Sequence, residues 1–166
     1  MKLLAFAYEK IKKEPAPYYF HYSLLSILAK PLRKWIAQVL APNCVSNHVR
    51  VFLYRLCGFK IGKRVFIGMK CYLDDVCYDQ LIIGNDVTVS YGVYFACHGK
   101  HQNHTPIRIE DGAYIGMRAS IISKSAAGDA GITVGQKAVV GACTLVNKDV
   151  PDGATAVGVP CRIIEK

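Results

Sequence analysis

From residue 61 onward the chain carries an aliphatic side chain every six residues. These positions, one of which holds the aromatic Phe95, form four groups of three: Ile61, Ile67 and Leu73; Ile83, Val89 and Phe95; Ile109, Ile115 and Ile121; and Val134, Val140 and Val146. In an α-helix a step of six residues is about 600°, which would scatter these side chains around the helix axis. We therefore predict short strands wound into an all-β solenoid, in which three hexapeptides make one triangular coil and stacked coils bury a ladder of Ile and Val.

A second regularity supports this interpretation. Four positions after most of the aliphatic residues stands a small or β-branched one: Val65, Cys71, Cys77, Val87, Val93, Ala113, Ala119, Ala138, Thr144 and Val150. We expect these residues to fit the tight turns between strands. Gly often follows the aliphatic residue directly, and we expect it to supply the unusual backbone angles of those turns.

The spacing between the four groups predicts where loops leave the solenoid. The groups begin at residues 61, 83, 109 and 134, so the steps of 22, 26 and 25 residues exceed an eighteen-residue coil by 4, 8 and 7. Each excess lies between the third hexapeptide of one coil and the first of the next, so all three insertions leave the same corner. The middle insertion, Cys97 to Arg108, reads CHGKHQNHTPIR and contains three of the five histidines. Loops along one edge of a rigid scaffold are where function is expected.

Residues 1–60 lack the period of six. Their apolar residues have helical spacing on either side of Lys30-Pro31, where we expect a break. Asn47 is expected to cap a further helix from Val49 to Leu56 that ends at Gly58. We therefore divide the chain into a helical segment, 1–60, which caps the open end of the solenoid, and the hexapeptide-repeat domain, 61–166.

Charge is distributed unevenly between these two parts. The chain has 21 Lys and Arg against 12 Asp and Glu, a net charge of +9, but residues 1–70 carry 13 against 2, and residues 71–166 carry 8 against 10. The basic helix around Trp35 has two interpretations: a peripheral membrane anchor, or a helix packed on the solenoid or on a neighbouring subunit, which we favour. No nucleic-acid-binding module accompanies this charge, so no nucleic acid partner is predicted.

The cysteines and the apolar runs indicate the compartment. Seven cysteines are an odd number, and none forms a C-x-x-C pair, which is typical of a reducing cytosol. The longest uncharged run, Pro15 to Ala29, is too short to span a bilayer, and we expect no signal peptide. We predict a cytoplasmic protein, either free or peripheral to the inner face of the membrane.

The hexapeptide array, the histidine-bearing loop and the ending VVGACTLVNKDVPDGATAVGVPCRII resemble the hexapeptide-repeat acyltransferases, whose fold is a left-handed parallel β-helix. The most similar branch is the maltose, galactoside, nodulation-sugar and capsule or exopolysaccharide O-acetyltransferases, and the resemblance extends from about Arg50 to Ile164. It implies left-handed coils, a homotrimer, acetyl-CoA as cosubstrate, and a hydroxyl of a sugar or polysaccharide precursor as acceptor.

Transfer of an acetyl group to a hydroxyl needs a base that takes the hydroxyl proton, and a neutral imidazole suits this role. The resemblance places the catalytic histidine at His98. It implies that Met117 and Ala142 lie beside the pantetheine arm, and that Asn147, Lys148 and Arg162 lie at the nucleotide end of coenzyme A, with Asn147 in place of the family's Thr. It also places Asp74 against the acceptor.

Several alternatives stay open. His98, His101 and His104 form H-x-x-H-x-x-H, which is compatible with a metal-dependent enzyme similar to the γ-type carbonic anhydrases, although we expect no metal. His101 or His104 could replace His98 as the base. Cys97 beside His98 suggests a Cys-His nucleophile pair, which is disfavoured because neighbouring residues of an extended segment point in opposite directions. A non-catalytic scaffold and an amine acceptor also remain open.

Overall fold

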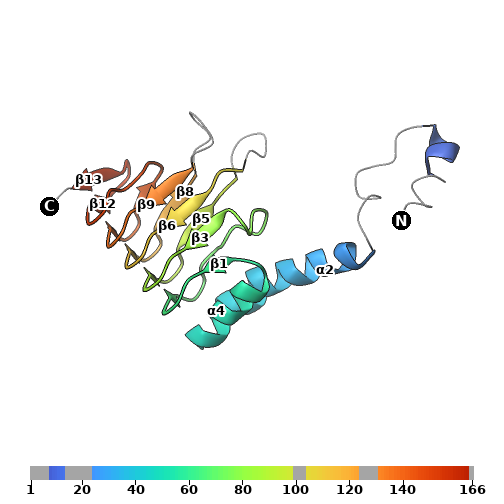
Figure 1. The fold of residues 1–166 in the computed structure, drawn as a ribbon, viewed down its shortest axis with the longest axis horizontal. Coiled ribbons are helices and arrows are strands. Elements are labelled where there is room, and N and C mark those ends of the chain that lie inside the picture. Colours follow the sequence, from blue (N-terminus) through green and yellow to red (C-terminus); the bar gives the residue numbers. More distant parts are fainter. Residues whose placement is uncertain (1–7, 14–23, 99–103, 124–130, 165–166) are drawn as a thin grey trace. The chain divides into compact units, whose positions relative to one another are not determined.

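The computed structural model describes residues 8–13, 24–98, 104–123 and 131–164, and the chain forms two compact units, Met1–Trp35 and Ile36–Lys166 (Figure 1). In the first unit, helix α2 (Leu24–Trp35) runs through Pro31, so the predicted break at Lys30-Pro31 is wrong. Proline has a helical φ, and here its missing N–H does not end the helix. Among the described residues, no helix has both the length and the apolarity that crossing a membrane requires.

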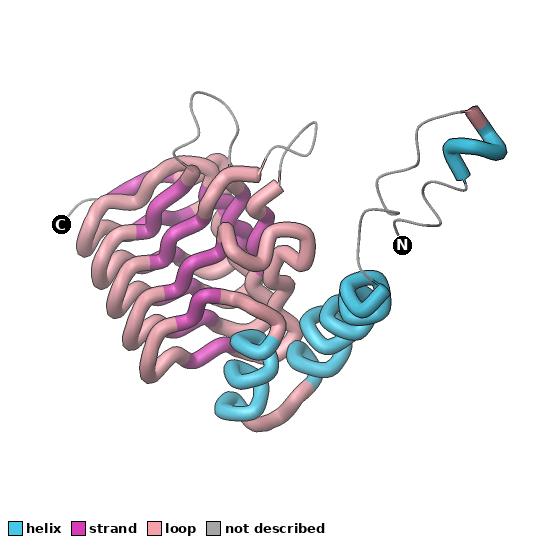
Figure 2. The backbone as a smooth tube through the Cα atoms, turned by 45° about the vertical axis from the view of Figure 1, so that its right-hand side comes forward, coloured by secondary structure: helices cyan, strands magenta, loops and turns pink. Residues whose placement is uncertain are grey.

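The second unit is a parallel β-solenoid, as predicted, preceded by helices (Figure 2). Its first sheet has the order β1-β3-β6-β9, with strands Lys60–Ile61, Leu81–Ile83, Ile107–Ile109 and Ile132–Val134. The second sheet has the order β13-β12-β10-β7-β4-β2, with strands Arg162–Ile164, Thr155–Val157, Val139–Val140, Tyr114–Ile115, Thr88–Val89 and Phe66–Ile67. The third has the order β11-β8-β5, with strands Leu145–Val146, Ser120–Ile122 and Tyr94–Ala96. All neighbouring strands are parallel except the pair formed by β12 and β13, which is antiparallel.

The core is the predicted aliphatic ladder. Ile67, Val89, Ile115 and Val140 occupy successive strands of the second sheet in register, and each is fully buried. The small residues at the turns are buried as well, including Ala113, Ala119 and Ala138. Burial of one branched aliphatic side chain contributes roughly 1.5–3 kcal/mol, so the repeated ladder is the main stabilising feature of the solenoid.

The glycines that follow the aliphatic residues have a different role from the one expected. Positive φ occurs two residues later, mostly at non-glycine positions such as Arg64 (52°), Asp86 (56°) and Lys137 (54°). A Cβ added to Gly62 would instead lie 2.4 Å from the carbonyl oxygen of Gly84 in the next coil. Glycine is therefore required there because the coils approach closely, and the prediction that it supplies the turn angles is wrong.

The predicted corner of the insertions is confirmed. The segments between β5 and β6 and between β8 and β9 both connect the third sheet to the first. Asp74–Gln80 makes the same connection in the first coil, because Tyr72 pairs with Tyr94 of β5 and residue 81 begins β3. We call this edge the loop corner.

The open end of the solenoid is covered by helices, as expected from an otherwise exposed strand edge. The π-helix η2 (Ile36–Leu40) and the short helix α3 (Ala41–Asn43) lead to α4 (Asn47–Leu56). The Asn47 side chain donates to the Val65 carbonyl (3.1 Å) and accepts from the Ile67 amide (3.0 Å), so it pairs with edge strand β2. The N-cap position belongs to Ser46, and the prediction that Asn47 caps the helix is wrong.

Two further α4 side chains form hydrogen bonds with the first coil, at the end of the solenoid that α4 covers. Arg50 is buried and donates from Nε to the Ile67 carbonyl (2.6 Å) and from Nη1 to the Cys44 carbonyl. The Tyr54 hydroxyl donates to the Cys71 carbonyl at 3.2 Å, and burial strongly raises the pKa of this tyrosine, which stays a donor. The backbone groups of the solenoid's edge are thus satisfied by α4 side chains.

Candidate active site

His98 lies at the loop corner, where the chain leaves β5. It forms an antiparallel bridge with His104, and the Thr105 amide donates to the Cys97 carbonyl at 2.9 Å. The two ends of this insertion are therefore held together directly beside His98. Its side chain is 38% exposed, so it is anchored yet accessible to a substrate.

Asp74 is fully buried beneath His98. It follows Leu73 of the first coil, and its Oδ2 accepts from the Cys97 amide at 2.7 Å and lies 2.5 Å from Nδ1 of His98. Its Oδ1 accepts from the Val76 amide at 3.0 Å. The two hydrogen bonds from backbone amides fix the orientation of the carboxylate. The stacking of the first coil on the second places it next to His98.

This contact determines the protonation pattern of a neutral His98. An ionised carboxylate only accepts hydrogen bonds, so Nδ1 must carry the proton and Nε2 keeps its lone pair. The arrangement matches the physical requirement for a general base, whose orientation and tautomer are set by a second group. The sequence predicted a catalytic role for His98 and an acceptor contact for Asp74, and it did not predict that the two side chains contact each other.

Cys97 is not arranged as a nucleophile. Its side chain is completely buried in the core, on the opposite side of the chain from His98. Burial is the main cause that raises its thiol pKa far above the ordinary value, and the nearby Asp74 carboxylate adds to this. A reactive cysteine needs a stabilised thiolate, whereas the surroundings of Cys97 favour the protonated thiol.

The outer face of the third sheet carries an aromatic pair that sequence reasoning missed. The rings of Tyr72 and Tyr94 stack with centroids 4.4 Å apart and an interplanar angle of 10°. The Tyr72 hydroxyl donates to Asp75 Oδ1 at 3.0 Å, and partial burial together with this bond raises the pKa of Tyr72. Tyr72 directly precedes the inward-facing Leu73, and Tyr94 directly precedes the inward-facing Phe95. Because neighbouring residues of a strand point to opposite faces, this spacing could have predicted two outward-facing tyrosines in adjacent coils.

The residues implied for coenzyme A lie at two edges of the third sheet and, for Arg162, in the second sheet. Met117 and Ala142 occupy the corner between the second and third sheets in successive coils, where the Cys143 amide donates to the Met117 carbonyl at 2.9 Å. Asn147 and Lys148 follow β11 at the loop corner and are exposed. Arg162 begins β13 and pairs with Val157 of the second sheet. Within one chain, Met117 and Ala142 therefore share a corner. Lys148 lies at the loop corner, whereas Arg162 lies at the β12–β13 pair of the second sheet.

The histidine cluster is described only in part. His98 and His104 lie side by side, whereas His101 lies outside the described residues. Within residues 8–13, 24–98, 104–123 and 131–164, no three His, Cys, Asp or Glu side chains are grouped as metal ligands. The three-histidine metal site stays an untested alternative.

Known structures share this fold. A hexapeptide-repeat-containing acetyltransferase from Vibrio cholerae superposes with a TM-score of 0.68 at 21% identity, over 87% of this chain and 93% of that one. A maltose O-acetyltransferase from Clostridium difficile superposes with a TM-score of 0.60 at 25% identity, over 87% and 89%.

Curated relatives match the solenoid part. Serine acetyltransferase from Bacillus licheniformis is 38% identical over 109 residues, which are 64% of this chain and 45% of the relative. A putative acetyltransferase from Staphylococcus aureus is 31% identical over 115 residues, 64% of this chain and 54% of the relative. The chain spans about half the length of the curated relatives it matches. The family model described as the hexapeptide repeat of succinyl-transferase matches residues 58–95 and 106–148, and with the solenoid these similarities show that the chain belongs to the hexapeptide-repeat acyltransferase family.

Proposed function

We propose that the protein transfers an acetyl group from acetyl-CoA to a hydroxyl of a sugar or polysaccharide precursor, with His98 as the general base. The observation that carries this proposal is the 2.5 Å contact between His98 Nδ1 and the buried Asp74 carboxylate. It leaves a lone pair on Nε2 of an accessible imidazole, in a family whose named relatives are acetyltransferases.

In this mechanism Nε2 takes the hydroxyl proton while the hydroxyl oxygen bonds to the carbonyl carbon of the thioester. The carbon–sulfur bond then breaks, and the His98 imidazolium returns its proton to the leaving thiolate. The products are the acetyl ester and free coenzyme A, so the base is regenerated. Asp74 acts as a positioning residue that stabilises the imidazolium without giving up its own charge.

The proposed role of Asp74 thus differs from the acceptor contact implied by the resemblance. Full burial and three hydrogen-bond donors leave this carboxylate little capacity to bind an acceptor. The Tyr72–Tyr94 pair is a better candidate for that contact. Tyr94 is 40% exposed, and an aromatic face packs well against the apolar face of a sugar ring.

Acetyl-CoA is proposed to lie along the third sheet, with Met117 and Ala142 beside the pantetheine arm. Asn147, Lys148 and Arg162 would contact the nucleotide end, where Lys and Arg suit the phosphates. The separation of Lys148 from Arg162 within one chain supports a homotrimer, because a groove between neighbouring subunits takes one corner from each. Holding both substrates in such a groove would supply much of the rate.

The hydroxyl of serine is a second candidate acceptor, which the 38% identity to a serine acetyltransferase favours. The aromatic pair favours the sugar instead. A reducing cytosol is the proposed location, which agrees with an odd number of cysteines and no C-x-x-C pair.

The test is acetylation of maltose, galactosides and serine, followed by mass spectrometry, with acetyl-CoA binding measured by calorimetry in the presence of a chelator. We expect His98→Ala to lower kcat by about a hundred- to ten-thousandfold and to keep acetyl-CoA affinity. His104→Ala is the matched histidine control and should retain activity. Loss of activity in His104→Ala alone would move the base to His104, and activity removed by the chelator would favour the metal-dependent alternative. No acetyl-CoA binding by the folded protein would favour a scaffold.

A further inference from the structure

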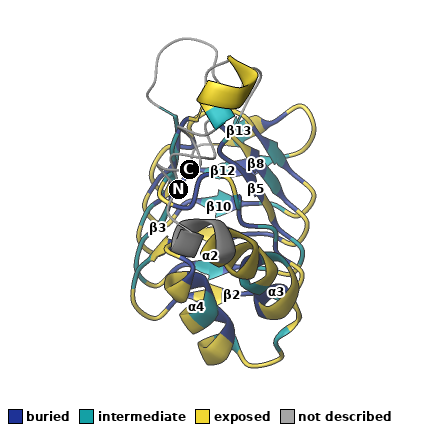
Figure 3. Ribbon diagram, turned by 90° about the vertical axis from the view of Figure 1, so that its right-hand side faces the viewer, coloured by how far each residue is buried: buried dark blue, intermediate teal, exposed yellow. Residues whose placement is uncertain are grey.

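Helix α4 has a second face, which points away from the solenoid. At about 100° per residue, Val49, Phe52 and Leu56 fall within about 60° of one another and opposite Arg50 and Tyr54. They are 47%, 61% and 63% exposed, and this side of α4 is largely yellow in Figure 3. Three large apolar side chains in one exposed stripe mark an interaction surface.

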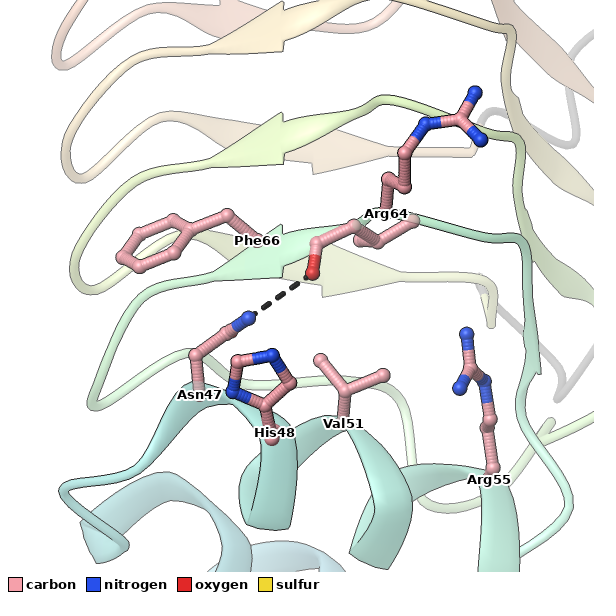
Figure 4. Close-up of a pocket in the computed structure, with 7 residues that line it drawn as sticks. Asn47, His48, Val51, Arg55, Arg64 and Phe66 are labelled. Atoms are coloured by element: carbon pink, nitrogen blue, oxygen red, sulfur yellow. Dashed lines mark hydrogen bonds between the residues drawn. The ribbon is translucent and has the colours of Figure 1, made fainter.

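The cationic side chain of Arg55 and the imidazole of His48 flank this stripe on one side. His48 and Arg55 lie between the stripe and the inward face of α4, and they line a groove of about 490 Å³ together with Val51, Phe66 and Arg64 (Figure 4). Arg55 donates to the carbonyls of Ile61 and Gly62. Because these acceptors are neutral, the bonds orient the guanidinium without cancelling its charge.

The charge of the surrounding chain has a single sign. Between Glu14 and Asp74 the sequence contains nine Lys and Arg and no Asp or Glu. Four of these basic residues lie exposed on the first coil: Lys60, Lys63, Arg64 and Lys70. Residues 71–99 contain no Lys or Arg at all, and Asp86 of the second coil pairs with Arg64 at 2.5 Å. Positive charge is thus concentrated at the end of the solenoid that α4 covers.

We propose that this end of the solenoid, the outward face of α4 together with the basic first coil, docks on a membrane surface that contains anionic lipids. An apolar stripe beside basic side chains is the pattern of an interfacial helix, and an anionic leaflet attracts each nearby Lys or Arg. A second copy of the chain would place two positively charged surfaces against each other. A neutral apolar partner would leave the flanking charges without counterions. This inference is independent of the acetyl-transfer proposal.

The test is co-sedimentation of the full-length protein with vesicles of phosphatidylcholine alone or mixed with phosphatidylglycerol. We expect binding to the mixed vesicles that weakens as salt is added. Phe52→Ser/Leu56→Ser should weaken it by more than about tenfold, since two apolar side chains no longer leave water. The matched control, Tyr114→Ser/Ile164→Ser, removes two exposed apolar side chains from the second sheet and should bind as the wild type does.

A second pair of variants tests the charge without touching the apolar stripe. Lys60→Gln/Lys63→Gln should weaken binding by about tenfold or more, whereas Arg118→Gln/Lys137→Gln, exposed on later coils, should have less effect. Absence of binding to mixed vesicles would overturn the proposal, as would equal loss in both members of either pair. Dimerisation that depends on Phe52, without vesicle binding, would identify a second copy as the occupant instead.

Discussion

Asp74 and His98 are 24 residues apart in the chain, yet Oδ2 of one lies 2.5 Å from Nδ1 of the other. The stacking of the first two coils produces this contact. Tyr72 and Tyr94 pair in parallel, Asp74 follows two residues after Tyr72, and His98 follows four residues after Tyr94. The stacked coils thereby place a fully buried carboxylate against a partly exposed imidazole.

We predict that Asp74→Asn lowers kcat by about a hundredfold or more and changes KM little. An amide can present either N–H or C=O to Nδ1 and therefore permits the tautomer in which Nε2 carries the proton. Steady-state kinetics with ¹⁵N NMR of the imidazole would measure both effects. A variant with normal kcat, or with a changed KM alone, would return Asp74 to the acceptor-binding role.

Cys97→Ala should keep most of the activity, since the buried thiol takes no part in the proposed mechanism. In the wild-type protein we expect alkylation to begin at exposed Cys143 and to be slow at Cys97 and Cys77, because burial raises the pKa of Cys77 to about 12 and that of Cys97 still further. Mass spectrometry after timed alkylation measures the order. Rapid modification of Cys97 with parallel inactivation would restore the Cys-His pair.

Gly62→Ala should reduce the free energy of unfolding by about 2 kcal/mol or more. The new Cβ would meet the Gly84 carbonyl oxygen at 2.4 Å, and the parallel backbones have no free space to separate. Urea denaturation measures the change. Ser90→Ala is the matched control, since Ser90 occupies the corresponding place in its hexapeptide and already carries a Cβ. Equal stability of the two variants would contradict the close-approach role of Gly62.

Stability should fall as the pH is lowered into the acidic range, partly through Asp111. Its carboxylate accepts from the Asn85 amide at 2.6 Å, and this bond is the main cause that lowers its pKa below the ordinary value. A lowered folded-state pKa stabilises the protein above the unfolded-state pKa, and this contribution is lost as pH falls through the folded-state pKa. Unfolding midpoints of wild type and Asp111→Asn against pH should therefore converge at low pH. Parallel curves would assign the acid sensitivity to other groups.

The coils, their core and the corner where the insertions leave were all readable from the sequence. Aliphatic side chains that recur at a fixed period are buried together when the coils stack on one another. Insertions that occur at the same point of every coil leave the solenoid at the same corner. The position of His98 followed from the same register. These features depend on local spacing along the chain, which is visible before any folding.

The remaining features depend on side chains that meet across coils or across the boundary between helix and solenoid. Asn47 pairs with the edge of β2 instead of capping its helix, and Gly62 serves a neighbouring coil instead of its own turn. Asp74 turns inward to His98, while Lys148 and Arg162 lie apart. A repeat specifies which residues share a layer, but rotamers and partners are set by hydrogen-bonding groups that only packing brings within reach.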